Sequence, residues 1–265
     1  MSVYYSAIAD LPLWATALII LGGLPVLAVT LQALTRRVLP PARAKDHNDV
    51  AGFLVAVIGV VYAVTAGFTI ADQWDNYAEA RQDVTEEAYA VASVAEGAAV
   101  AGTGERREIT AAAVAYGRAV VAWWPDAPGE AGDTVREDRA MERLHAAVRS
   151  VRPDSEAERA YVSEATGQLM RVSVLRGHRH NEAGTAHLEA PMWVAVVVVS
   201  AVTLLFSLLF GLERPWLHYV MVAGVALVVA VNLFLVLLLE YPLVGTLAVT
   251  SESFRELARE PASGI

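Results

Sequence analysis

The 265-residue sequence contains no cysteine. Without thiol groups the chain can form neither a disulfide framework nor a thiolate metal site, and it has no sulfur-based redox chemistry. The sequence also lacks a phosphate-binding glycine loop, a zinc-binding helix motif and a Gly-x-Ser-x-Gly nucleophile turn. These absences predict that the protein is not an enzyme and that it holds no cofactor.

Charge is scarce and one-sided. Charged residues make up 18% of the chain and hydrophobic residues 55%, a balance too apolar for a soluble domain of this size. The formal net charge is -9, which argues against a nucleic-acid partner because phosphates need basic surfaces. Lys45 is the only lysine among 20 basic residues, and this usage, with abundant Ala and Val, indicates a high-GC bacterial source.

The apolar residues gather in four long runs. Each run is long enough to cross roughly 30 Å of hydrocarbon at about 1.5 Å per residue. Residues 1–10 contain no Lys or Arg, unlike a secretory signal, so the first run is expected to remain as a span. We therefore predict a multi-pass protein of the bacterial inner membrane, with the lipid bilayer as a partner and spans at Leu11–Leu34, Val50–Ala71, Pro191–Leu212 and Trp216–Leu239.

The second run continues into the polar stretch Asp72–Arg81 without a proline or a turn residue. This continuity predicts one long helix whose first half crosses the membrane and whose second half stands outside it. The predicted organisation is transmembrane helices 1 and 2 in residues 1–71, a helical extramembrane domain in 72–190, transmembrane helices 3 and 4 in 191–240, and an amphipathic C-terminal tail in 241–265.

The segment between the second and third spans has helical periodicity throughout. Apolar residues recur at three- and four-residue spacing, and no stretch alternates as a strand would. Gly177 and Gly184 are candidate interruptions of the last helix. The fold class is therefore predicted to be all-α, with helices at Glu79–Val100, Glu105–Trp124, Thr134–Val151 and from Asp154 towards the third span.

A motif follows the second span, where Phe68 precedes Trp74-Asp75-Asn76-Tyr77-Ala78-Glu79-Ala80-Arg81. Together with the four-span pattern, it resembles the bestrophin family of ion channels and its bacterial relatives. His47-Asn48-Asp49 and Glu240–Gly245 look more like the bestrophin-like branch. The resemblance implies a homopentamer that conducts inorganic ions, with the second span lining a central pore that narrows at a hydrophobic neck. The acidic run of the eukaryotic calcium clasp has no counterpart here, so calcium gating is not predicted.

Two stripes run along the second span. Val60, Val64 and Phe68 recur every four residues and form the candidate pore neck, where an apolar constriction can gate by dewetting. The neighbouring small-residue stripe would allow close helix packing. The alternative is that both stripes are ordinary packing or lipid faces. The small residues are Gly52, Ala56, Gly59, Ala63 and Gly67.

The motif residues also have two interpretations. Trp74 and Tyr77 fit interfacial anchors, and Asp75, Glu79 and Arg81 fit a solvated helix face with local ion pairs. The functional alternative is an electrostatic ring beyond the neck, and we favour a structural network over that ring.

Other function classes are less well supported. The histidines His178, His180 and His187 lack the carboxylate spacing of a usual metal motif, so no metal site is predicted. No charged residue lies mid-span, which argues against a proton-coupled transporter. The remaining rival to a channel is a non-conducting scaffold or signalling protein whose helical domain binds a partner protein.

Membrane orientation is left open by the sequence. The loop that holds Arg36, Arg37, Arg43 and Lys45 should face the cytoplasm by the positive-inside rule. The resemblance implies the reverse.

Overall fold

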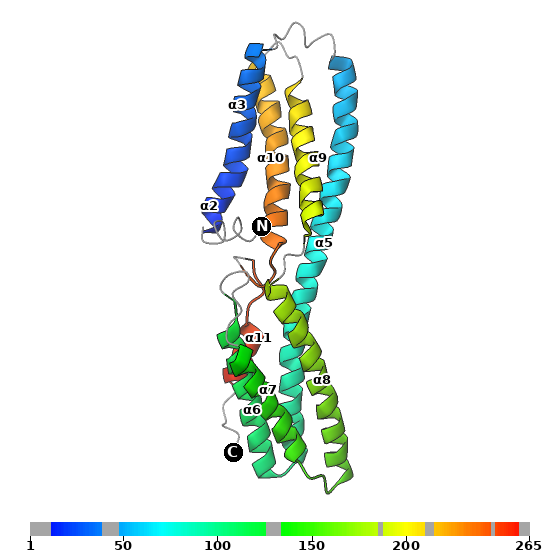
Figure 1. Cartoon of the computed structure of the whole chain (residues 1–265), viewed down its shortest axis with the longest axis vertical. Coiled ribbons are helices and arrows are strands. Elements are labelled where there is room, and N and C mark those ends of the chain that lie inside the picture. The colour runs from blue at the N-terminus through cyan, green and yellow to red at the C-terminus, as the bar shows by residue number, and fades with distance from the viewer. Residues whose placement is uncertain are drawn as a thin grey trace. The chain divides into compact units, whose positions relative to one another are not determined.

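The computed structural model describes residues 12–38, 48–125, 134–184, 188–209, 215–244 and 247–259. These residues form helices and connecting segments with no strand among them, which confirms the all-α prediction (Figure 1). The chain divides into two compact units. The first unit comprises Met1–Asp75 with Ala186–Glu240, and the second comprises Asn76–Thr185 with Tyr241–Ile265.

Among its described residues, the first unit contains four helical segments that are long and apolar enough to cross a membrane, as predicted. The third span ends at Leu208, before the predicted Leu212, and residues 210–214 lie outside the described residues. The first span consists of α2 (Leu13–Ala17), the π-helix η1 (Leu18–Gly22) and α3 (Gly23–Val38); the others are the first part of α5 (Asn48–Gly97), α9 (Ala190–Leu208) and α10 (Pro215–Leu239).

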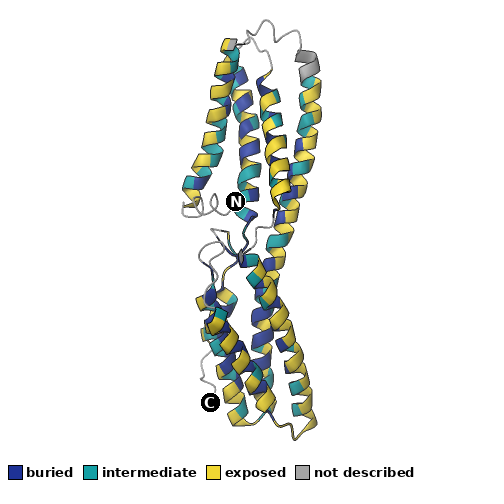
Figure 2. Ribbon diagram, in the orientation of Figure 1, coloured by how far each residue is buried: buried dark blue, intermediate teal, exposed yellow. Residues whose placement is uncertain are grey.

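Helix α10 is the packing centre of the first unit. Its buried positions recur every three or four residues, and they contact α3, α9 and α5 (Figure 2). Val222 and Ala226 pack against Ala28 of α3, whereas Val229 packs against Tyr62 and Ala66 of α5. The apolar windows of the four spans are only 11–33% buried. Most of their apolar surface therefore faces lipid or another chain.

The second unit is a helical bundle built on the remainder of α5. The described part of the segment between the second and third spans is largely helical, and α8 passes through Gly177 without interruption before it ends at Gly184. The other elements are η2 (Ala98–Val100), α6 (Thr103–Trp123), α7 (Thr134–Ser150), α8 (Glu156–Gly184) and α11 (Glu252–Arg259).

Local sequence signals explain where the bundle helices begin. Pro153 lies between α7 and α8, where it prevents a continuous helix. Ser155 and Glu158 then form a capping box at the start of α8. The Glu158 amide donates to Ser155 Oγ at 3.1 Å, and the Ser155 amide donates to Glu158 Oε2 at 3.1 Å. At the start of α6, the Gly102 amide donates to Glu105 Oε2 at 3.2 Å. These bonds satisfy amides that the first turn leaves unpaired.

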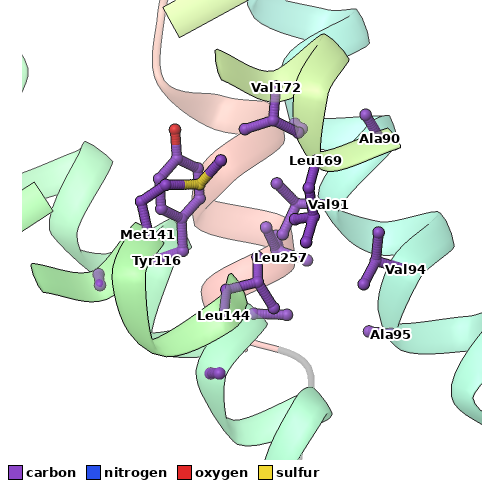
Figure 3. Close-up of a cluster of buried hydrophobic side chains, with 14 of the residues drawn as sticks. Ala90, Val91, Val94, Ala95, Tyr116, Met141, Leu144, Leu169, Val172 and Leu257 are labelled. Atoms are coloured by element: carbon purple, nitrogen blue, oxygen red, sulfur yellow. The ribbon is translucent and has the colours of Figure 1, made fainter. Parts of the chain in front are cut away.

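The apolar core of the second unit draws on all of its main helices. Figure 3 shows Val91 of α5, Leu144 of α7 and Leu169 of α8 converging in this core. Helix α11 approaches α6 closely, because a Cβ added at Gly117 would lie 3.2 Å from Leu257. A larger residue at this position would push α11 away.

Helix α5 runs without a break from Asn48 to Gly97, which confirms the predicted continuity. Asn48 is its first residue, and His47 lies outside the described residues.

Proline at the exposed residue Ala78 should break α5. Ala78→Pro removes one backbone hydrogen bond and clashes with the preceding turn, so the free energy of unfolding should fall by about 3 kcal/mol or more. Thermal melts in detergent, followed by circular dichroism, measure the change. Ala78→Leu, which keeps the helical backbone, should melt close to wild type. Equal melting of the proline variant would mean that α5 is not helical at this point.

Candidate functional site

Helix α5 presents one covered face to its own chain in the first unit. The side chains of this face are buried and recur at Tyr62, Ala66, Thr69 and Gln73. Tyr62 and Ala66 contact the cluster around Val229 of α10. At about 100° per residue, these four side chains lie within one narrow sector of the helix. This covered face serves as the reference for the angular positions of the other faces around the helix.

The small-residue stripe of Gly52, Ala56, Gly59 and Ala63 lies beside the covered face. None of the four is buried. A Cβ added at Gly59 would meet no atom of the described residues within 4 Å. Among the described residues, therefore, nothing packs tightly against Gly59. Its predicted packing role stays a prediction, and it now concerns contact with a second copy.

The candidate neck residues lie on the side of α5 opposite the covered face. Val60 is 64% exposed, Val64 52% and Phe68 76%. Asp75 continues this line, because it lies seven residues beyond Phe68, and it is also exposed. The structure of one chain thus groups Val60, Val64, Phe68 and Asp75 on one uncovered face. Their role in a pore stays a prediction.

The other motif residues are spread around the helix. Trp74 is 58% exposed, and Glu79 and Arg81 are exposed as well. Tyr77 is half-buried and packs against the apolar core of the second unit. Both interpretations of the motif, a structural network and an electrostatic ring, stay predictions.

A buried carboxylate joins three spans at one end of the first unit. Glu240, directly after α10, is 2% exposed. Its Oε1 accepts a hydrogen bond from Trp193 Nε1 of α9 at 3.2 Å, and its Oε2 accepts one from Gln73 Nε2 of α5 at 3.5 Å. Unpaired polar groups are costly in such apolar surroundings. These bonds therefore hold the ends of the three spans together.

His218 forms a second polar contact, in the first turn of α10, and sequence reasoning missed it. Gln32 Nε2 lies 3.0 Å from His218 Nδ1, and His218 Nε2 lies 3.3 Å from the Ser207 carbonyl oxygen. A neutral ring that donates from Nε2 and accepts at Nδ1 satisfies both contacts. Because His218 lies in the first turn of α10, it does not contradict the prediction that no charged residue lies mid-span. Its two ring nitrogens are occupied in tying α3 and α9 to α10.

A buried ionic cluster holds the helices of the second unit together. Arg179 of α8 is 1% exposed and contacts two carboxylates that are fully buried, Glu87 of α5 and Glu137 of α7. Its Nε donates to Glu87 Oε2 at 2.8 Å, and its Nη2 donates to Glu137 Oε1 at 2.5 Å. Arg176 Nε lies 2.8 Å from Glu137 Oε1. Two arginines thus balance two carboxylates.

Aromatic rings enclose the Arg179 guanidinium. Its Cζ lies 4.4 Å from the ring centroid of Trp123 and 5.8 Å from that of Phe254. Tyr116 donates its hydroxyl proton to Glu87 Oε1 at 2.5 Å. The cluster and its enclosing rings therefore link α5, α6, α7, α8 and α11.

The surroundings shift the pKa values of this cluster. Burial alone would raise the pKa of Glu137, but the hydrogen bond from His180 and the charges of Arg179 and Arg176 outweigh it and lower the pKa from 4.5 to about 2. Burial, reinforced by the negative charge of Glu87, raises the pKa of Tyr116 well above its usual value. Burial opposes the charged form of Arg179, yet the two carboxylates raise its pKa.

The histidines considered as metal ligands have separate partners. His178 Nδ1 lies 2.8 Å from Asp83 Oδ2, whereas His180 Nε2 lies 3.1 Å from Glu137 Oε2. His180 also stacks on Trp123, with ring centroids 4.5 Å apart. His187 lies outside the described residues. Among the described residues, no group of three or more potential ligands could hold a metal ion.

Sequence reasoning also missed the ionic cluster, although a signal for it exists. Arg179 follows Leu169, Val172 and Leu175 on the apolar face of α8. Glu87 and Glu137 stand at equivalent core positions of α5 and α7. A charge on the core face of each of three neighbouring helices is a pattern that predicts mutual pairing.

Comparison with known proteins gives a consistent family assignment. A family model described as the Bestrophin-like domain matches residues 22–254. The comparison with curated proteins found no match.

Several solved structures share the fold. A crystal structure of a membrane protein variant has a TM-score of 0.66 at 12% identity, covering 89% of this chain and 96% of that one. A variant of a bacterial bestrophin homologue from Klebsiella pneumoniae has a TM-score of 0.64 at 13% identity, covering 88% of this chain and 96% of that one. Another variant from the same organism has a TM-score of 0.65 at 12% identity, with 89% and 98% coverage. At such low identity these likenesses establish the fold alone.

The charge of Glu137 should stabilise the protein in a pH-dependent way. Its folded-state pKa of about 2 lies below the ordinary 4.5, so this stability is complete above pH 4.5 and is lost as the pH falls towards 2. Glu137→Gln should therefore lower the free energy of unfolding by about 3 kcal/mol at neutral pH, at about 1.4 kcal/mol per pKa unit.

Denaturant unfolding of the full chain in detergent, at several pH values, measures this difference. The gap between wild type and Glu137→Gln should shrink as the pH falls from 4.5 towards 2. Asp138→Asn is the matched control, because Asp138 is the exposed neighbour and pairs with Arg176 at 2.5 Å. It should have a much smaller effect. A gap for Glu137→Gln that is independent of pH would contradict the assignment.

Proposed function

This chain belongs to the bestrophin-like family, and on that basis we propose that it is a homo-oligomeric ion channel. Five copies would surround a central pore, α5 would line it, and ions would pass passively. The protein would lie in the bacterial inner membrane as a multi-pass protein. The bilayer, further copies of the chain and inorganic ions are its proposed partners.

The uncovered faces of α5 carry this proposal. Around the helix, the face covered by its own chain is followed first by the small-residue stripe and then by the face of Val60, Val64 and Phe68. A ring of helices needs a side face for the neighbouring copy and an inner face towards the axis. Small residues suit the first because they let backbones approach closely. The apolar face then falls on the remaining side, towards the axis.

The chemistry of the inner face fits a gated passive pore. Valine and phenylalanine side chains give a constriction from which water withdraws, so ions pass only when it widens. Asp75 lies beyond Phe68 on the same face and would place a ring of carboxylates at one mouth of the pore. Passive conduction needs no proton relay within the bilayer.

Gly59→Leu tests the side face. Because a Cβ at Gly59 meets open space within one chain, the leucine variant should keep the wild-type fold. It should weaken the oligomer, since a bulky side chain separates helices of neighbouring copies. Gly59→Ala keeps the residue small and should assemble normally. Native mass spectrometry in detergent reports the oligomeric state. An unchanged oligomer for the leucine variant would show that this stripe is not a contact between copies.

A double truncation tests the inner face. Val64→Ala with Phe68→Ala should widen and wet the neck, so ion flux into liposomes should rise while the oligomer stays intact. Val194→Ala with Val198→Ala makes a similar truncation at exposed positions of α9 and should leave flux unchanged.

The rival accounts predict other results for the double variant. A face towards lipid predicts no change in flux, and a buried packing face predicts a loss of a few kcal/mol per truncation in thermal melts. If neither the wild type nor the variant shows ion flux although both form intact oligomers, the result would favour the non-conducting scaffold.

A further inference from the structure

We propose that the first unit holds one phospholipid acyl chain in a groove between α2–α3, α9 and α10. The groove is open to one side, has a volume of about 350 Å³, and is lined by apolar side chains from these elements. Its size falls in the range of small-molecule sites. The inference requires only that the four spans lie in a membrane, and it does not depend on the chain being a channel.

The direction of the groove matches that of an acyl chain. Each wall is built from residues one helical turn apart: Ile19, Gly23 and Leu27 on the first span, and Trp193 and Val197 on α9. The groove therefore runs along the spans, for about 12 Å between Ile19 and Leu27 at about 1.5 Å per residue. An acyl chain of the bilayer lies in this same direction.

One end of the groove is marked by a polar contact. Trp193 forms part of the wall, and its indole nitrogen donates to Glu240 directly after the end of α10. The start of α2, the start of α9 and the end of α10 lie at this end of the unit (Figure 1). Tryptophan anchored in this way is typical of the headgroup level. This end of the groove would therefore lie at the headgroup level, and the rest of the groove would extend into the hydrocarbon region.

Local backbone structure makes room for the occupant. The π-helix η1 (Leu18–Gly22) supplies Ile19 and Ile20 to the wall. Short π-helical segments within α-helices occur frequently at functional sites. Gly23 follows it, and a Cβ added there would meet no described atom within 4 Å. The groove is open on one side, and its exposed lining is almost entirely apolar, so in a membrane it offers contacts to an apolar molecule rather than to water. In a bilayer, the abundant apolar molecule is the lipid tail.

The open space at Gly23 provides a direct test. Gly23→Leu should fold normally, since leucine favours the helix and its Cβ is unobstructed. Its side chain would occupy the groove. Gly224→Leu is the matched control, because Gly224 also has open space but lies outside the groove lining.

Native mass spectrometry of the detergent-purified full-length protein should find one phospholipid retained per chain in wild type and in Gly224→Leu. Occupancy should fall about tenfold or more in Gly23→Leu, because the leucine side chain takes the volume of the acyl chain; a tenfold fall corresponds to about 1.4 kcal/mol. No retained lipid in wild type, or equal retention in all three proteins, would overturn the proposal.

A second measurement does not depend on the folding of any variant. Wild-type protein in vesicles of phosphatidylcholine with a diazirine in the acyl chain is irradiated, purified and digested. Cross-links retained after exchange into unlabelled lipid should concentrate on residues 19–27 and on Val197. Cross-links spread evenly over the exposed spans would contradict a bound acyl chain. So would the absence of cross-links at these residues, which is the result expected if a side chain of a second copy filled the groove.

Discussion

Helix α5 is only partly covered by the rest of its own chain. One sector of this span is buried, at Tyr62, Ala66, Thr69 and Gln73, and the rest of an apolar helix is exposed or half-buried. In a bilayer, apolar surface is not driven together as it is in water, so packing shape and polar contacts decide which faces meet. The proposed assembly and conduction therefore depend on the small and apolar faces of α5.

Polar contacts between helices fix the packing within each unit. In the first unit, Glu240 and His218 each tie helices to α10 through hydrogen bonds. In the second unit, Arg179 and its two carboxylates do so through buried charge. A buried ion pair adds little stability over an apolar replacement, but breaking one leaves a costly unpaired charge. Such contacts therefore favour the one arrangement of helices in which every buried charge is paired.

The sequence predicts the helices better than it predicts their contacts. Run lengths give the four spans, and the absence of proline and turn residues after Ala71 gives the continuity of α5, because both are local properties of the chain. The ionic cluster is different, since Arg179 lies 92 residues from Glu87 and 42 from Glu137. Only tertiary packing brings these groups together. The groove beside Gly23 likewise depends on the packing of three spans and on the π-helix η1, and no local sequence pattern predicts either of them.

In the proposed assembly, the face of Val64 points towards the axis of a closed ring of copies. The chain has no cysteine, so a spin label can be placed cleanly at Val64→Cys and, in a separate protein, at the exposed α9 residue Val198→Cys. Pulsed electron–electron double resonance then gives the distance between copies. If α5 lines the axis, the labels at position 64 should lie closer together than those at position 198. A longer distance at position 64, or no distance between copies, would contradict it.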